Sequence, residues 1–148
     1  MKDKHLYLSK IFFFVLIAIF ILLVIYFLVP VSDVMKRNLF PFAAVLAFLF
    51  FIFGAALLFL SWKSKVKGRL KTFLFLTAIS AVGFLVSVFL HNFFYALGMI
   101  AANITVLRIL MEVLHVTFFI IAIPICPIVF LIGAVGGIVK FIKKQQPL

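Results

Sequence analysis

Four long runs of apolar residues, with almost no polar position inside them, dominate this chain. The runs cover residues 11–31, 39–61, 72–97 and 109–139, and each reaches the roughly 20 residues that a helix needs to cross the ~30 Å hydrocarbon core of a bilayer. None of the runs alternates apolar and polar positions as the strands of a membrane β-barrel do. Because a backbone in lipid must satisfy its hydrogen bonds within its own segment, each run predicts a transmembrane α-helix.

Local signals refine the expected helices. Pro41 is expected in the first turn of the second helix, where its missing N–H costs little. The stretch 91–115 is interpreted as the outer end of the third helix, a tight turn near 98–103 and the start of the fourth helix. The sequence Pro-Ile-Cys-Pro at 124–127 releases backbone carbonyls and predicts a kink. The first run is longer than a signal-peptide core and no cleavage site follows it, so we expect it to be retained.

The composition agrees with a membrane protein. Of 148 residues, 68% are hydrophobic and 22 are Phe, while only 11% are charged, against about a quarter in a soluble domain. So few polar residues cannot cover the surface of a water-soluble globule, and so apolar a chain is not intrinsically disordered. We therefore expect an all-α polytopic membrane protein with four transmembrane helices, forming a single domain over residues 1–148.

Basic residues are distributed unevenly among the polar segments. Eleven of the 14 Lys and Arg lie in the N-terminal segment, between the second and third runs, or after the fourth run, whereas the others are Lys36, Arg37 and Arg108. Since Lys and Arg concentrate in cytoplasmic segments, this asymmetry predicts that both termini are cytoplasmic. The same residues are expected to meet anionic lipid headgroups. The net charge of +11 therefore does not indicate a nucleic-acid partner.

Small residues indicate which helix faces meet. Small side chains let membrane helices approach closely, and three of the four helices carry a stripe of them: Ala43, Ala47 and Gly54; Ser80, Gly83 and Ser87; Gly133 and Gly137. We expect a compact bundle of the second, third and fourth helices, with the bulkier first helix more peripheral. The last glycine pair also fits the seam of a homo-oligomer.

Ionisable residues in or beside a span are the candidates for chemistry, because their burial in lipid is costly. Glu112 and His115 are three residues apart and share one helix face, and His91 is expected at a similar depth on the neighbouring helix. Two imidazoles and a carboxylate suit a divalent metal ion, and two facing histidines suit a haem iron. The alternative is structural: Glu112 pairs with Arg108, and the histidines lie at the membrane interface.

One resemblance adds to this interpretation. The run Leu-His-Asn-Phe-Phe-Tyr-Ala-Leu at 90–97, together with the run at 124–137 that begins Pro-Ile-Cys-Pro, is similar to small uncharacterised four-span integral membrane proteins of bacteria. The resemblance implies a location in the bacterial plasma membrane. It implies no activity and no cofactor.

The sequence offers little for catalysis. Its acidic residues are Asp3, Asp33 and Glu112, and it contains no phosphate-binding glycine loop and no nucleophile–base arrangement. The leading hypothesis is a non-enzymatic accessory or structural subunit of a membrane assembly, with a protein partner or a second copy of the chain. The alternatives are a metal- or haem-binding bundle using the two histidines and Glu112, and a small oligomeric channel or transporter.

Overall fold

The computed structural model describes residues 4–143, which form helices and no strands. The four helical stretches are α1 (Lys4–Leu28), α2 (Asp33–Lys63), α3 (Arg69–Ile100) and a final stretch composed of α4 (Thr105–Ile120), the π-helical segment η1 (Ile121–Ile125) and α5 (Cys126–Lys143). Each stretch is long and apolar enough to cross a membrane. The prediction of an all-helical chain with four long apolar helices is confirmed.

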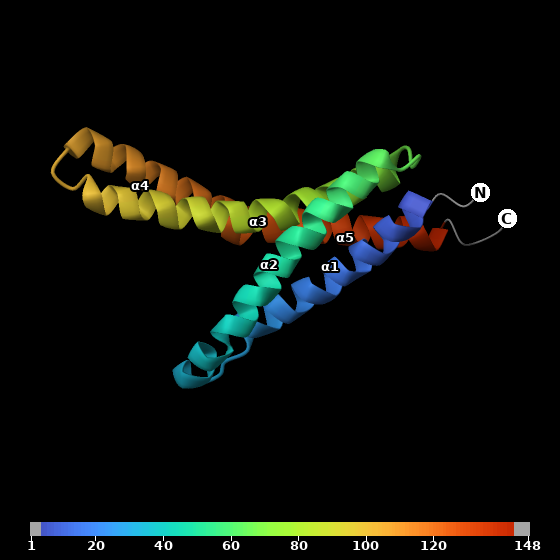
Figure 1. Ribbon diagram of the computed structural model, residues 1–148, viewed down its shortest axis with the longest axis horizontal. Helices are drawn as coiled ribbons and strands as arrows, with labels where there is room; N and C mark the ends of the chain where they lie inside the picture. The colour runs from blue at the N-terminus through green and yellow to red at the C-terminus, as the bar shows by residue number, and fades with distance from the viewer. Residues whose placement is uncertain (1–3, 144–148) are drawn as a thin grey trace.

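The helices form two antiparallel hairpins arranged as a V (Figure 1). One hairpin consists of α1 and α2, and the other of α3 with α4, η1 and α5. The hairpins pack together where α1 begins, α2 connects to α3 and α5 ends; we call this the closed end. Toward their turns, at 29–32 and 101–104, the hairpins diverge. The expected compact bundle is therefore present only toward the closed end.

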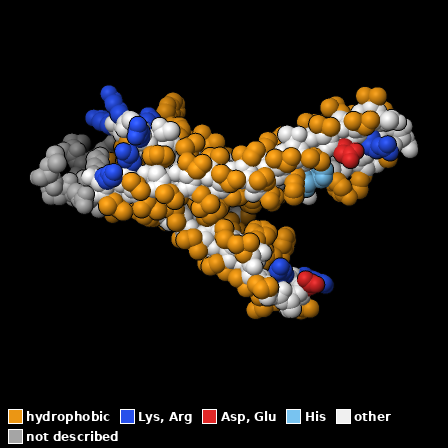
Figure 2. All heavy atoms as spheres, turned by 180° about the vertical axis from the view of Figure 1, so that it is seen from behind, with side chains coloured by type: hydrophobic (Ala, Val, Ile, Leu, Met, Phe, Trp, Pro, Cys, Tyr) orange, Lys and Arg blue, Asp and Glu red, His pale blue; other side chains and the backbone are white. Residues whose placement is uncertain are grey.

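The closed end is also where the basic side chains gather. Figure 2 shows a cluster of Lys and Arg at this end, and smaller charged groups at the two hairpin turns. Apolar side chains cover most of the surface between them on this face. A long apolar surface bounded by charged ends is what a helical membrane protein presents to lipid.

The helix bounds differ from the predicted spans at both ends of every stretch, and two of the differences lie near a proline. α1 ends two residues before Pro30 rather than at 31, because proline disfavours helical backbone in the residue before it. α2 begins at Asp33, well before the expected position 39, and the Ser32 hydroxyl accepts a hydrogen bond from the backbone N–H of Met35 at 3.4 Å. This cap and the acidic first turn stabilise the earlier start. Pro41 consequently lies inside α2, and its predicted first-turn position is wrong.

Glycines allow the helices to approach closely. A Cβ atom on Gly54 would lie 2.8 Å from the Cβ of Ala81, so α2 and α3 leave no room there for a larger residue. A Cβ on Gly133 would lie 2.6 Å from the Thr77 hydroxyl oxygen and 2.7 Å from its backbone nitrogen, where α5 meets α3. The small-residue face of α5 is therefore occupied by contacts within the chain.

The first helix is the least buried of the four spans, as the sequence predicts, but it enters the core at the closed end. Phe13 of α1 is fully buried, and its ring lies 5.6 Å from the ring of Phe141 in α5. A Cβ on Gly137 would come within 2.5 Å of the Phe13 ring. At this end the otherwise peripheral helix reaches α5, because the glycine leaves a hollow that the phenylalanine fills.

Candidate functional site

His91 of α3 and His115 of α4 face each other across the second hairpin. Their ring centroids lie 4.0 Å apart, with 23° between the ring planes. The Nδ1 atom of His91 is 3.0 Å from the carbonyl oxygen of His115, and the Nδ1 atom of His115 is 3.3 Å from the carbonyl oxygen of His91. Because a carbonyl oxygen only accepts hydrogen bonds, each Nδ1 carries a hydrogen and donates it. The Nε2 atoms are not used by these two bonds.

Further aromatic rings surround the histidine pair. The Tyr95 ring lies 5.2 Å from the imidazole of His115, and the Phe119 ring lies 5.4 Å from that of His91. One turn away, Phe94 of α3 stacks on a phenylalanine of α4 with 5.6 Å between centroids. α4 has no buried residue, so these ring contacts are a main attachment of α4 to α3.

Glu112, the third predicted metal ligand, does not join the two histidines. Residues 4–143 contain no group of three His, Cys, Asp or Glu side chains close enough to hold a metal ion. Glu112 shares a helix face with His115 by its spacing, but its side chain is exposed. The structure therefore assembles two of the three candidates. The stacked rings also leave no space between them for a haem iron bound from opposite sides.

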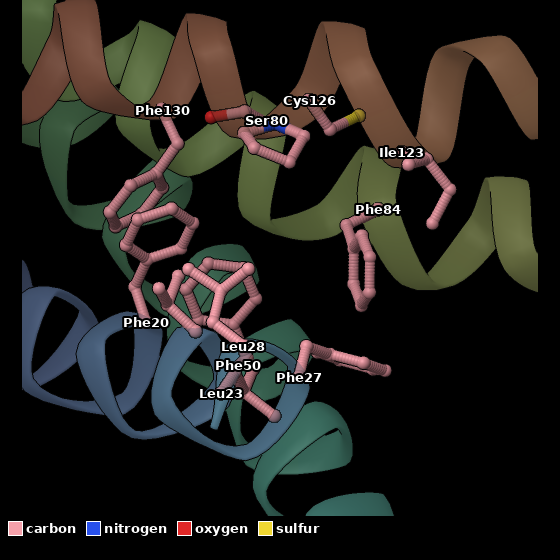
Figure 3. Close-up of a pocket in the computed structure, with 12 residues that line it drawn as sticks. Phe20, Leu23, Phe27, Leu28, Phe50, Ser80, Phe84, Ile123, Cys126 and Phe130 are labelled. Carbon is pink, nitrogen blue, oxygen red and sulfur yellow. The ribbon is translucent and has the colours of Figure 1, made fainter. Parts of the chain in front are cut away.

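The diverging hairpins enclose a second feature, an apolar crevice of about 330 Å³ (Figure 3). Phe20 of α1, Phe50 of α2 and Phe130 of α5 close one side of the crevice. The Phe130 ring lies 4.4 Å from that of Phe20 and 5.2 Å from that of Phe50. Farther out, Phe27 of the first hairpin and Phe84 of the second lie on opposite walls. All four helical stretches thus contribute to one crevice.

Almost every group on the crevice wall is apolar. The polar exceptions among the side chains are Ser80 and Cys126. The Ser80 hydroxyl donates a hydrogen bond of 2.6 Å to the carbonyl oxygen of Leu76 in its own helix, which satisfies its donor. The crevice is therefore suited to hydrocarbon or apolar side chains rather than to a polar ligand.

The π-helical segment η1 forms part of this wall. It contains Pro124, and Pro127 follows in the first turn of α5. This π-helical segment lies where the proline pair predicts a kink. The interruption lies where Ile123 and Cys126 line the crevice. Sequence reasoning found the prolines but missed the crevice, since the crevice exists only because the hairpins diverge.

Comparison of the chain with known protein families, curated proteins and solved structures finds no match.

Removing the histidine contact is expected to loosen the second hairpin. His91→Ala and His115→Ala should each lower the free energy of unfolding by about 1 kcal/mol, because each deletes one stacked ring and one hydrogen bond between helices. In the double variant, the two losses should fall short of additivity by about 0.5–1 kcal/mol, since both single variants remove the same stack. Unfolding by SDS titration in detergent micelles measures all four proteins.

Asn92→Ala provides the control for this cycle. The Asn92 side chain donates a hydrogen bond of 2.8 Å to the Val88 carbonyl oxygen, which belongs to its own helix. In the double variant with His115→Ala, the losses in the free energy of unfolding should add. Additive losses for the histidine pair itself would contradict a direct interaction.

Proposed function

We propose that this integral membrane protein is a non-catalytic accessory subunit that holds an apolar transmembrane segment of a partner protein between its two hairpins. The observation that carries the proposal is the apolar crevice, which is open between the arms of the V and has walls from both hairpins. Such a crevice can bind a partner through shape complementarity and dispersion contacts rather than through reactive or charged groups. These are the terms that drive association between helices in lipid.

The aromatic walls make the crevice selective in shape. The rings of Phe20, Phe50 and Phe130 hold one another in a cluster, so they present a fixed surface rather than mobile side chains. Phe84 adjoins this cluster, with its ring centroid 6.4 Å from that of Phe50. A partner helix with small or branched residues on one face would insert those side chains into the crevice beside these rings. Lipid chains, which are mobile, match such a fixed surface less well.

Photo-crosslinking in membranes of the source organism tests this proposal. A benzoylphenylalanine in place of Phe27, which is 62% exposed on the crevice wall, should give one protein adduct of defined mass. The same group in place of Phe48, which is 57% exposed and does not line the crevice, should not. Adducts to lipid alone from both positions would contradict a partner helix.

The proposal includes an orientation and a location. The cluster of basic residues at the closed end supports placing that end in the cytoplasm. The resemblance of the 90–97 and 124–137 runs to bacterial membrane proteins supports the bacterial plasma membrane. Cysteine labelling from outside intact cells should reach the turn at 101–104 and fail to reach the connection at 64–68.

A metal-binding protein is the second candidate, and the histidine pair favours it. In metal sites, a ligating histidine usually donates its other ring N–H to a carbonyl or carboxylate, which orients the free nitrogen toward the metal. His91 and His115 both donate from Nδ1 in this way. Protein purified in mild detergent should then contain near-stoichiometric metal by elemental analysis, and His115→Ala should lose it. Metal-free wild-type protein would exclude this candidate.

A further inference from the structure

Basic side chains from two distant parts of the sequence line one hollow at the closed end. The hollow has a volume of about 480 Å³. Its basic residues come from the α2–α3 connection with the start of α3, and from the last turn of α5: Lys65, Lys67, Arg69, Lys140 and Lys143. No Asp or Glu is among the described residues that line it.

The backbone of the α2–α3 connection holds these side chains in place. Val66 and Leu70 are both 8% exposed and belong to the hydrophobic core. Val66 lies between the exposed residues Lys65 and Lys67, and Leu70 follows the exposed Arg69. The apolar anchors therefore fix the connection on the helices and leave its basic residues facing outward. A flexible surface loop would not keep the charges at constant positions.

The start of α3 adds positive potential to the hollow. α3 begins at Arg69, and its N-cap, Gly68, with φ of 71°, makes no side-chain cap to the first-turn N–H groups. Such groups carry the positive end of the helix dipole. The acidic residues of the described chain, Asp33 and Glu112, lie in the first turn of α2 and in α4, near the turns of the hairpins. The described residues that line the hollow are thus basic or apolar.

We infer that this hollow binds the headgroup of an anionic phospholipid that carries two phosphate groups. Basic side chains bind phosphate oxygens through charge-assisted hydrogen bonds. The five cations stand in two sets, one on the connection and start of α3 and the other on α5, which suits two phosphates. This inference does not depend on the proposed partner helix, and it goes beyond the general attraction of basic segments for anionic lipid because it assigns one hollow.

A lipid fits the position of the hollow better than a soluble phosphate. Trp62, 70% exposed, lies in the last turn of α2 just before the connection, and tryptophan prefers the membrane–water interface. The apolar outer surfaces of α3 and α5 continue from this level toward the middle of the spans. A headgroup in the hollow would therefore leave its acyl chains in the bilayer.

The single tryptophan of the chain provides the readout. Protein in phosphatidylcholine vesicles is titrated with brominated cardiolipin, which quenches a nearby indole, and in parallel with brominated phosphatidylcholine. Wild-type protein should be quenched at a much lower fraction of the two-phosphate lipid. Equal quenching by the two lipids in the wild-type protein would overturn the inference without any variant.

Two charge-matched variants distinguish binding at a defined site from diffuse attraction of anionic lipid to the basic end of the protein. The hollow variant removes three lining charges: Lys67→Gln, Arg69→Gln and Lys140→Gln. The surface variant removes three charges at the same end that do not line the hollow: Lys4→Gln, Lys10→Gln and Lys71→Gln. The hollow variant should need at least about tenfold more cardiolipin for half-quenching, and the surface variant less than about threefold more.

The other outcomes are equally decisive. Equal weakening in the two variants would show that the basic end attracts anionic lipid without a defined site, and would overturn the inference. Competition by millimolar inorganic phosphate as effective as that by cardiolipin would assign the hollow to a soluble anion instead. Unchanged helical circular dichroism of both variants confirms that the comparison is between folded proteins.

Discussion

Gly133→Ala is expected to lower the free energy of unfolding by about 3 kcal/mol, the upper part of the range for overpacking a protein interior. The added Cβ would lie 2.7 Å from the backbone nitrogen of Thr77 and 3.0 Å from the carbonyl oxygen of Phe73. Backbone atoms cannot turn away as a flexible side chain can. α5 must therefore shift away from α3, and this shift also disturbs the neighbouring contact between Gly137 and the ring of Phe13.

Gly83→Ala is the matched control for this substitution. A Cβ on Gly83 would meet only the sulfur of Cys126 at 3.5 Å, which is ordinary van der Waals contact. It should stabilise the protein by up to about 1 kcal/mol, because alanine has a higher helix propensity than glycine and the added Cβ has room. Both variants are measured by SDS titration and by thermal unfolding in detergent. Equal stability of the two would show that α3 and α5 are not in close contact at Gly133.

Phe130→Ala should destabilise the protein by about 2–3 kcal/mol. The Phe130 side chain is 1% exposed and contacts the rings of Phe20 and Phe50. Truncation in a soluble core costs about 3–5 kcal/mol through lost transfer energy and a cavity. The transfer part is smaller in a membrane because lipid is also apolar, but the cavity and the lost ring contacts remain.

Phe48→Ala provides the comparison for Phe130. Phe48 is 57% exposed on α2, so lipid already contacts its ring and would occupy the space that truncation leaves. Its free energy of unfolding should change by less than about 0.5 kcal/mol. If the two phenylalanines were equally costly to truncate, Phe130 would not be the centre of an aromatic cluster between the hairpins.

Much of the fold is predictable from the sequence because bilayer thickness and backbone hydrogen bonding act locally. The apolar runs identify all four helices, and the turn expected near 98–103 lies between α3 and α4. The bounds fail where a local cap outweighs hydropathy, as at Ser32, which starts α2 six residues before the apolar run. The divergence of the hairpins depends on contacts between distant segments, such as Gly133 with Thr77, and no local pattern encodes it.

The candidate sites were likewise predictable from the sequence only in part. Counting residues from the helix ends predicts that His91 and His115 lie at a similar depth in the membrane. The structure places their rings 4.0 Å apart. The same counting cannot say which way a side chain turns, and Glu112 is not grouped with the histidines. The sequence shows the charged connection between α2 and α3 but not the hollow. The other wall of the hollow is formed by Lys140 and Lys143, which lie about 70 residues farther along the chain.

The V has a consequence for the bilayer around it. α3 has 32 residues, or about 48 Å at 1.5 Å per residue, which is long enough to cross a ~30 Å hydrocarbon core at a slant. Because the hairpins diverge from the closed end (Figure 1), we expect the protein to displace more lipid area in one leaflet than in the other. Such asymmetry is relieved where the membrane already bends toward the narrower leaflet. We therefore expect the protein to concentrate in strongly curved membrane, and to bend flat membrane when it is abundant.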